Sequence, residues 1–250
     1  MYHWDLPYAL QCKGGFGNRK IVDWFLEYAR VLLDHFGADV PIRATFNEPI
    51  AIYVGYYMGI FAPGLHDEEY ARQSLHNLLV CHGKAVQKFR TYGFPDSKIG
   101  IVVDVWHHYP ARPDNADDIA MAIHSNEIEG YGMFLNPLFL GGWTGEMQAY
   151  LKEKQFQIDV LPGDFDIIRE PIDYYGLNFC NGLFDNAKEH AEAQSAENCR
   201  ILYHNHDQEL TKIQVNGEEM FALDHFMRRT SDNIMLQMDI GWAFRIQKPS

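Results

Sequence analysis

Apolar and polar positions follow two periodicities along the chain, which predict a repeated order of helices and strands. From Asn18 onward, apolar side chains recur every three or four residues, as in an amphipathic helix that ends at Gly37. A second helical pattern ends before Gly93, and shorter ones cover 116–123 and 146–152. The two longer apolar faces consist of Ile21, Trp24, Phe25, Tyr28, Leu32 and Phe36, and of Leu75, Leu78, Leu79, Val86 and Phe89.

Short apolar runs between these helices indicate strands, and a continuous run indicates a strand buried on both faces. A further helix is expected near 220–227. The alternation predicts a parallel α/β fold of the (βα)8 TIM-barrel type. About six strands are recognisable where a closed barrel has eight, so an incomplete barrel, an open sheet or a dimer is expected. The predicted strands are the end of one at 2–4, then 42–46, 99–105, 174–179, 201–203 and 234–238.

The composition fits an enzyme with a sizeable core and narrows its partners. Hydrophobic residues make up 47% of the chain and aromatic residues 14%. The net charge of −13 argues against nucleic acid or an anionic membrane as a partner. No run approaches the roughly 20 apolar residues of a membrane span, and the four cysteines lack metal-site or redox spacing. A cytoplasmic protein, with homo-oligomers possible, is the expectation.

Candidate chemistry begins where the predicted strand 42–46 ends. The amide of Asn47 can hold a sugar hydroxyl while the carboxyl group of Glu48 exchanges a proton with a glycosidic oxygen. An isolated Asn-Glu pair at a strand end is more often simply solvated. Here it lies within Thr45-Phe46-Asn47-Glu48-Pro49, about forty residues after Tyr2-His3-Trp4-Asp5-Leu6-Pro7.

Together the two motifs resemble family 1 glycoside hydrolases, the retaining β-glucosidases, over about residues 1–182. The resemblance implies that Glu48 is the general acid/base and that the substrate is a β-glucoside or oligosaccharide, with no cofactor. It places His3, Trp4, Asn47 and Asn178 in the sugar-binding subsite. Further matching segments are Gly14–Asn18, Gly55–Gly64, Asn136–Phe139 and Asp173–Asn178.

The nucleophile of that family has no visible counterpart. A retaining glycosidase needs a second carboxylate, which this family takes from a Thr-Glu-Asn-Gly motif. That tetrapeptide does not occur in the sequence, nor do the family's first two strands, and Cys180 stands where the family usually has Tyr. Asp104, Asp207 or Glu209 could replace the nucleophile, although a solvated acid at a strand end is the more ordinary interpretation of each.

From about residue 187 the sequence resembles the xylose-isomerase-like sugar isomerase/epimerase family, which also forms a barrel. The resemblance makes Asp239 a candidate ligand for a divalent metal and places His206 near the substrate, whereas the remaining metal ligands have no counterpart. The chain is therefore interpreted as a hybrid, or chimera, of two barrel fragments, 1–185 and 186–250, packed in the same domain and joined near 182–195.

Three functions remain open from the sequence. The first is β-glucoside hydrolysis by Glu48, impaired because the nucleophile motif is absent. The second is a metal-dependent sugar isomerase or epimerase. The third is a non-catalytic hybrid that at most binds sugar through His3, Trp4 and Asn47.

Overall fold

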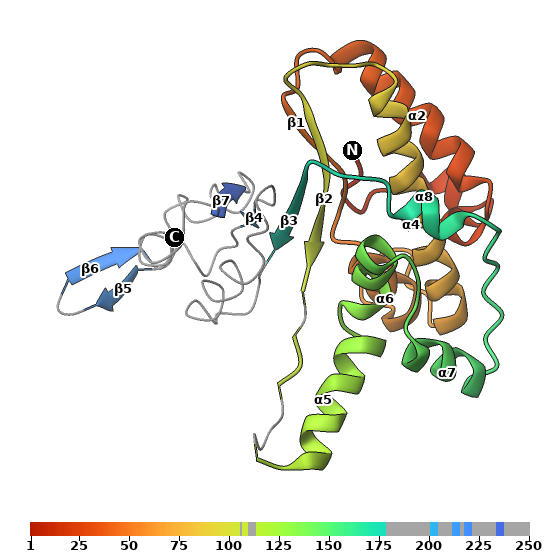
Figure 1. Ribbon diagram of the computed structural model, residues 1–250, viewed down its shortest axis with the longest axis vertical. Helices are drawn as coiled ribbons and strands as arrows, with labels where there is room; N and C mark the ends of the chain where they lie inside the picture. Colours follow the sequence, from red (N-terminus) through yellow and green to blue (C-terminus); the bar gives the residue numbers. More distant parts are fainter. Residues whose placement is uncertain are drawn as a thin grey trace. The chain divides into compact units, whose positions relative to one another are not determined.

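The computed structural model describes residues 1–105, 107–109 and 114–178, and the strands 201–204, 212–215, 218–221 and 234–237 (Figure 1). The chain divides into two units, Met1–Ile172 and Asp173–Ser250. The junction predicted near 182–195 lies outside the described residues, so the division into fragments 1–185 and 186–250 stays a prediction.

A parallel strand–helix–strand unit forms the centre of the first unit. Strands β1 (Ile42–Asn47) and β2 (Lys98–Asp104) pair in parallel, and helix α4 (Glu68–Arg90) lies between them in the chain. Tyr2 adds a single parallel bridge to Phe46 on β1, at the place where the sequence predicts the end of a strand. After Lys98, every residue of β2 is buried, which confirms the prediction of a strand covered on both faces.

Helix α4 is largely buried along its length. All five apolar residues of its predicted face are buried: Leu75, Leu78, Leu79, Val86 and Phe89. The carboxylate of Asp67 accepts a hydrogen bond from the Tyr70 amide and caps its first turn. Gly83 permits close packing, because a Cβ there would lie 1.8 Å from the Ile167 carbonyl oxygen of helix α8 (Asp164–Ile168).

Helix α2 (Ile21–Phe36) confirms the predicted helix but not all of its predicted face. It packs beside α4 (Figure 1). The structure buries Ile21 and Phe25 but leaves 46% of Tyr28 and 55% of Phe36 exposed. The buried stripe instead continues through Val22, Ala29 and Leu33. Buried residues recur every four positions, so the face of α2 that packs against the core does not include Tyr28 or Phe36.

Short helical segments connect these elements. After Glu48 and Pro49 the chain enters α3 (Ile50–Tyr53), which continues directly into a π-helix, η2 (Val54–Met58). Helices α5 (Ala116–Ile128) and α7 (Gly145–Glu153) confirm the two shorter predicted helices and extend beyond them. The remaining segments are α1 (Tyr8–Gln11), η1 (Gly15–Gly17), α6 (Gly132–Leu135) and η3 (Asn136–Leu140).

The second unit contains strands only, among the residues that the structure describes. Strand β3 (Tyr174–Asn178) is followed by β4 (Ile201–His204), which pairs in parallel with β7 (Ile234–Gln237). Strands β5 (Lys212–Val215) and β6 (Glu218–Phe221) form an antiparallel pair that the sequence did not predict. The helix expected near 220–227 is therefore wrong at Met220 and Phe221, which belong to β6.

A buried carboxylate joins three parts of the first unit. Asp164, at the start of α8, accepts hydrogen bonds from Arg19 at 2.7 Å and from His76 of α4 at 2.8 Å. It also accepts the Leu161 amide at 2.9 Å. Although burial alone would raise the pKa of Asp164, the bonds from Arg19, His76 and the Leu161 amide together lower it to about 2.

Replacing Asp164 with Asn should lower the free energy of unfolding by roughly 1.5–3 kcal/mol near neutral pH, because hydrogen bonds to a charged carboxylate are lost. Since the folded-state pKa is depressed, this contribution is complete above the ordinary pKa of about 3.8 and disappears as pH falls towards 2. Urea unfolding of both proteins across this range measures the difference, which should narrow with acid. A difference that widens as pH falls would contradict this role of Asp164.

Candidate active site

Asn47 and Glu48 stand where β1 leaves the sheet. Ala44 pairs with Gly100 and Asn47 pairs with Val102, so β1 advances three residues while β2 advances two. This extra residue is a β-bulge, which changes the direction of the strand and of the side chains that follow it. On the other edge of β1, the Tyr2 amide donates to the Thr45 carbonyl and the Asn47 amide donates to the Tyr2 carbonyl, both at 3.0 Å.

Glu48 is held in an uncommon backbone conformation at the end of this strand. Its φ is 51°, in the left-handed region, and its amide donates to the Val102 carbonyl of β2 at 2.8 Å. Its side chain is buried, with 5% exposed. Such backbone conformations cost about 1–3 kcal/mol and cluster at functional sites.

The predicted sugar-binding residues from the N-terminal segment meet at Asn47. The Trp4 indole nitrogen donates to the Asn47 carbonyl at 3.2 Å, and the Asn47 side-chain nitrogen lies 3.4 Å from His3 Nε2. Trp4 also has a left-handed backbone, with φ of 73°. The structure therefore brings His3, Trp4 and Asn47 together next to Glu48, although they are far apart in the sequence.

An aromatic cavity lies beside Trp4. It has a volume of about 360 Å³, and the rings of Trp4 and Phe61 stack with centroids 5.2 Å apart. Burial raises the pKa of Tyr56 to about 12, so its hydroxyl stays protonated and donates to Gln11 at 2.6 Å. The lining residues are Tyr2, Trp4, Ala51, Ile52, Tyr56, Ile60, Phe61 and Ala62.

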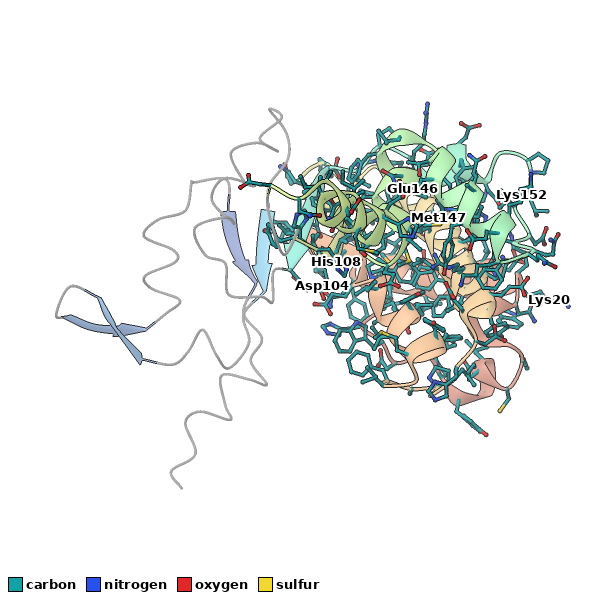
Figure 2. All side chains as sticks on the ribbon, turned by 90° about the horizontal axis from the view of Figure 1, so that it is seen from below. Lys20, Asp104, His108, Glu146, Met147 and Lys152 are labelled. Atoms are coloured by element: carbon teal, nitrogen blue, oxygen red, sulfur yellow. The ribbon has the colours of Figure 1, made fainter. Side chains whose placement is uncertain are left out.

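Asp104 is a second buried carboxyl group at the same edge of the sheet. It is the last residue of β2, and the carboxyl ends of parallel strands share one edge. In Figure 2, Asp104 and His108 lie towards one side of the first unit, and Lys20 and Lys152 lie towards the opposite side. The His108 amide donates to Asn126 at 2.8 Å, which ties the segment after β2 to α5.

Asn178 ends β3 and is fully buried, and it belongs to the second unit, whereas His3, Trp4 and Asn47 belong to the first. Asp207, Glu209 and Asp239 lie outside the described residues, as do Cys180 and His206. Within the described ranges, no group of three His, Cys, Asp or Glu side chains is arranged to hold a metal ion. None of the helices in this part of the chain is long and apolar enough to span a membrane.

Two residues near the site were not singled out from the sequence. Thr45 of β1 and His82 of α4 are fully buried, and Thr45 Oγ1 lies 2.7 Å from His82 Nδ1. The sequence does contain a signal for His82. It stands four residues from both Leu78 and Val86, so it occupies the apolar face of the predicted helix.

The sequence matches a known protein family. The model of glycosyl hydrolase family 1 matches residues 1–244. The chain belongs to this family. The match continues past residue 187, so it also covers the stretch in which the sequence resembles sugar isomerases and epimerases.

Relatives within family 1 include β-glucosidases. β-Glucosidase A of Thermotoga maritima is 40% identical over 183 residues, which are 73% of this chain and 40% of the relative. β-Glucosidase A of Acetivibrio thermocellus is 38% identical over 179 residues, 71% of this chain and 39% of the relative. The family 1 chain thus spans about 40% of the length of these curated relatives.

Solved structures of family 1 enzymes share the fold. The β-glucosidase of Thermotoga maritima superimposes with a TM-score of 0.65 at 40% identity, covering 72% of this chain and 40% of that one. A β-glucosidase from Exiguobacterium marinum gives 0.79 at 25% identity, covering 95% and 65%. These neighbours are TIM barrels, and the family 1 chain described here is an α/β fragment of that architecture.

The left-handed backbone of Glu48 predicts an unusual order of stability. Glycine in a strand is ordinarily less stable than alanine, but at a positive φ it avoids the Cβ strain. We therefore expect Glu48→Gly to be more stable than Glu48→Ala by about 1 kcal/mol, measured by urea unfolding. The same pair at Asn47, a strand residue without a positive φ, should show the opposite order. Equal stabilities of the two Glu48 variants would contradict the assigned strain.

Proposed function

We propose that this chain forms the acid/base side of a retaining β-glucosidase site, in which Glu48 is the general acid and base. The observation that carries the proposal is the burial of Glu48 at the end of β1, directly after Asn47, the residue that His3 and Trp4 contact. Membership in family 1 and 40% identity to a β-glucosidase support it. The substrate class is a β-glucoside or β-linked oligosaccharide.

The chemistry assigned to Glu48 has two steps. As the glycosidic bond breaks, the protonated carboxyl group gives its proton to the leaving oxygen. The resulting carboxylate later takes a proton from the water that attacks the sugar. Proton transfer of this kind contributes about 10²–10⁴-fold to a rate.

Positioning of the sugar falls to the polar groups around Glu48. The Asn47 amide and the His3 ring can each donate to or accept from sugar hydroxyls, and the Trp4 ring offers an apolar face. Because Trp4 is bonded to the Asn47 carbonyl, these groups are arranged before a substrate arrives. We include Asn178 in the same role by family likeness.

The second carboxylate must lie about 5–5.5 Å from Glu48 to attack the anomeric carbon. Among the described residues, Asp104 is a candidate, because it is buried on the strand adjacent to β1. Asp207 and Glu209 are further candidates from the sequence. Since the family's Thr-Glu-Asn-Gly motif is absent from the sequence, we propose that hydrolysis by this chain is weak. Unchanged turnover in Asp104→Asn would remove Asp104 from consideration.

Replacing Glu48 with Gln should slow hydrolysis in a way that depends on the leaving group. A methyl β-glucoside needs a proton on its leaving oxygen, so its hydrolysis should fall by about 10²–10⁴-fold. A 2,4-dinitrophenyl β-glucoside leaves without a proton, so formation of its glycosyl intermediate should be nearly unchanged. Rates of leaving-group release in the first turnover, before the intermediate is hydrolysed, measure this difference for wild type and variant on both substrates.

The matched control is Glu146→Gln, which makes the same chemical change on the exposed surface of α7 and should leave both rates unchanged. Equal losses on both substrates in Glu48→Gln would contradict acid catalysis by Glu48. Loss of wild-type turnover on chelation would favour the metal-dependent isomerase or epimerase and its candidate ligand Asp239. Sugar binding without any turnover would favour the non-catalytic hybrid.

A further inference from the structure

The β-bulge before Asn47 is held by side chains as well as by the strand backbone. Inside the irregular stretch, the hydroxyl of Thr45 lies 3.2 Å from the Gly100 carbonyl of β2. The same hydroxyl lies 2.7 Å from His82 Nδ1 on α4. One oxygen atom therefore links three elements, β1, β2 and α4, two residues before Asn47 and three before Glu48.

The direction of these two hydrogen bonds follows from their chemistry. A carbonyl oxygen only accepts, so the Thr45 hydroxyl must give its single proton to Gly100. Thr45 Oγ1 can then only accept from His82, which fixes the proton of that imidazole on Nδ1. The result is a one-way chain from the His82 N–H through the Thr45 hydroxyl to the Gly100 carbonyl.

Burial keeps this series of hydrogen bonds in one protonation state. Thr45 and His82 are both 0% exposed, and burial lowers the pKa of His82 to about 3, so the ring is neutral at ordinary pH. His82 Nε2 has no hydrogen-bond partner among the described residues. Among the described residues, the imidazole therefore hydrogen-bonds to Thr45 alone, and that bond is not interrupted by titration at ordinary pH.

We propose that Thr45 and His82 are positioning residues of this site, which hold the β-bulge in the shape that aims Asn47 and Glu48. The proposal rests on the proposed function of Glu48 and adds to it the residues that set its direction. Neither residue is assigned contact with the sugar. Their effect passes through the backbone of Phe46 and Asn47, whose course depends on how the bulge is closed.

The test compares Thr45→Val, which removes the hydroxyl but keeps the branched shape, with Thr45→Ser, which keeps the hydroxyl. The first readout is the pH at which the Glu48 carboxyl group titrates, followed by ¹³C NMR. The signal is assigned by its absence from the Glu48→Gln spectrum. The second readout is kcat on a β-glucoside. Misplacement of a catalytic group by about 1 Å costs roughly 100-fold.

We expect Thr45→Val to move the Glu48 titration midpoint by about 0.5 pH units or more and to lower kcat by roughly 100-fold. In Thr45→Ser, the Glu48 midpoint and kcat should both stay near their wild-type values. Val86→Ala is the control for lost stability, because it truncates a fully buried residue of α4 that belongs to a separate apolar cluster. It should leave the Glu48 midpoint unchanged. A Thr45→Val midpoint equal to that of Val86→Ala would overturn the proposal.

A second pair of variants keeps the test decisive if Thr45→Val does not fold. His82→Leu removes the donor while Thr45 keeps its bond to Gly100, and His82→Asn restores a donor near the Nδ1 position. The Glu48 titration midpoint should shift in His82→Leu and return to the wild-type value in His82→Asn. Identical midpoints in the two variants would overturn the proposal. If the wild type shows no hydrolysis, the proposed function fails, and the NMR midpoints still decide the positioning role.

Discussion

The irregular pairing of β1 with β2 is the constraint on which the site depends. Its register gains one residue between Ala44 and Asn47, and directly afterwards the Glu48 amide bonds to the Val102 carbonyl. A regular register would place Asn47 and Glu48 one residue further along and reverse the faces to which their side chains point. The left-handed backbone at Glu48 is tolerated because pairing on both edges of β1 leaves the chain little alternative.

Helix α4 supports this arrangement with buried polar groups as well as with apolar packing. Asn77 donates to the Phe16 carbonyl at 2.8 Å, His76 bonds to Asp164, and His82 bonds to Thr45. Each bond reaches a different neighbour, namely η1, α8 and β1. Apolar contacts have no preferred direction, whereas a buried polar group that loses its partner costs free energy. These three contacts therefore fix the rotation of α4 about its axis and its position along that axis.

Local sequence patterns predicted most elements, and their errors share a physical origin. The apolar run of β2 reflects burial on both faces, so the sequence alone was sufficient there. In α2, the small Ala29 gave no strong apolar signal, whereas the large Tyr28 and Phe36 did, and the structure buries Ala29 instead. Met220 and Phe221 of β6 were predicted as part of a helix, because the pairing of β6 with β5 is a contact between two segments, which a local pattern does not contain.

The site shows the same difference between local patterns, which the sequence contains, and contacts between separate segments, which it does not. The Asn47–Glu48 motif indicated where the chemistry lies, and the structure places His3 and Trp4 beside it. The bulge could not be predicted, because it is a property of the register between two strands. The proposed role of Thr45 and His82 depends on the packing of α4 against β1 and β2, which the sequence alone does not show.

The π-helix η2 has a consequence for how this family can vary in length. A π-turn is an α-helical turn with one added residue, so removing one residue from Val54–Met58 would restore an ordinary helix. The shortened turn would absorb this deletion, so the side chains after it would keep their directions around the helix axis. Phe61 would then stay against the ring of Trp4, and the change would fall on the part of the cavity wall that Tyr56 forms. The extra residue of η2 thus allows this wall to vary in length while the β-bulge and Trp4 keep their places.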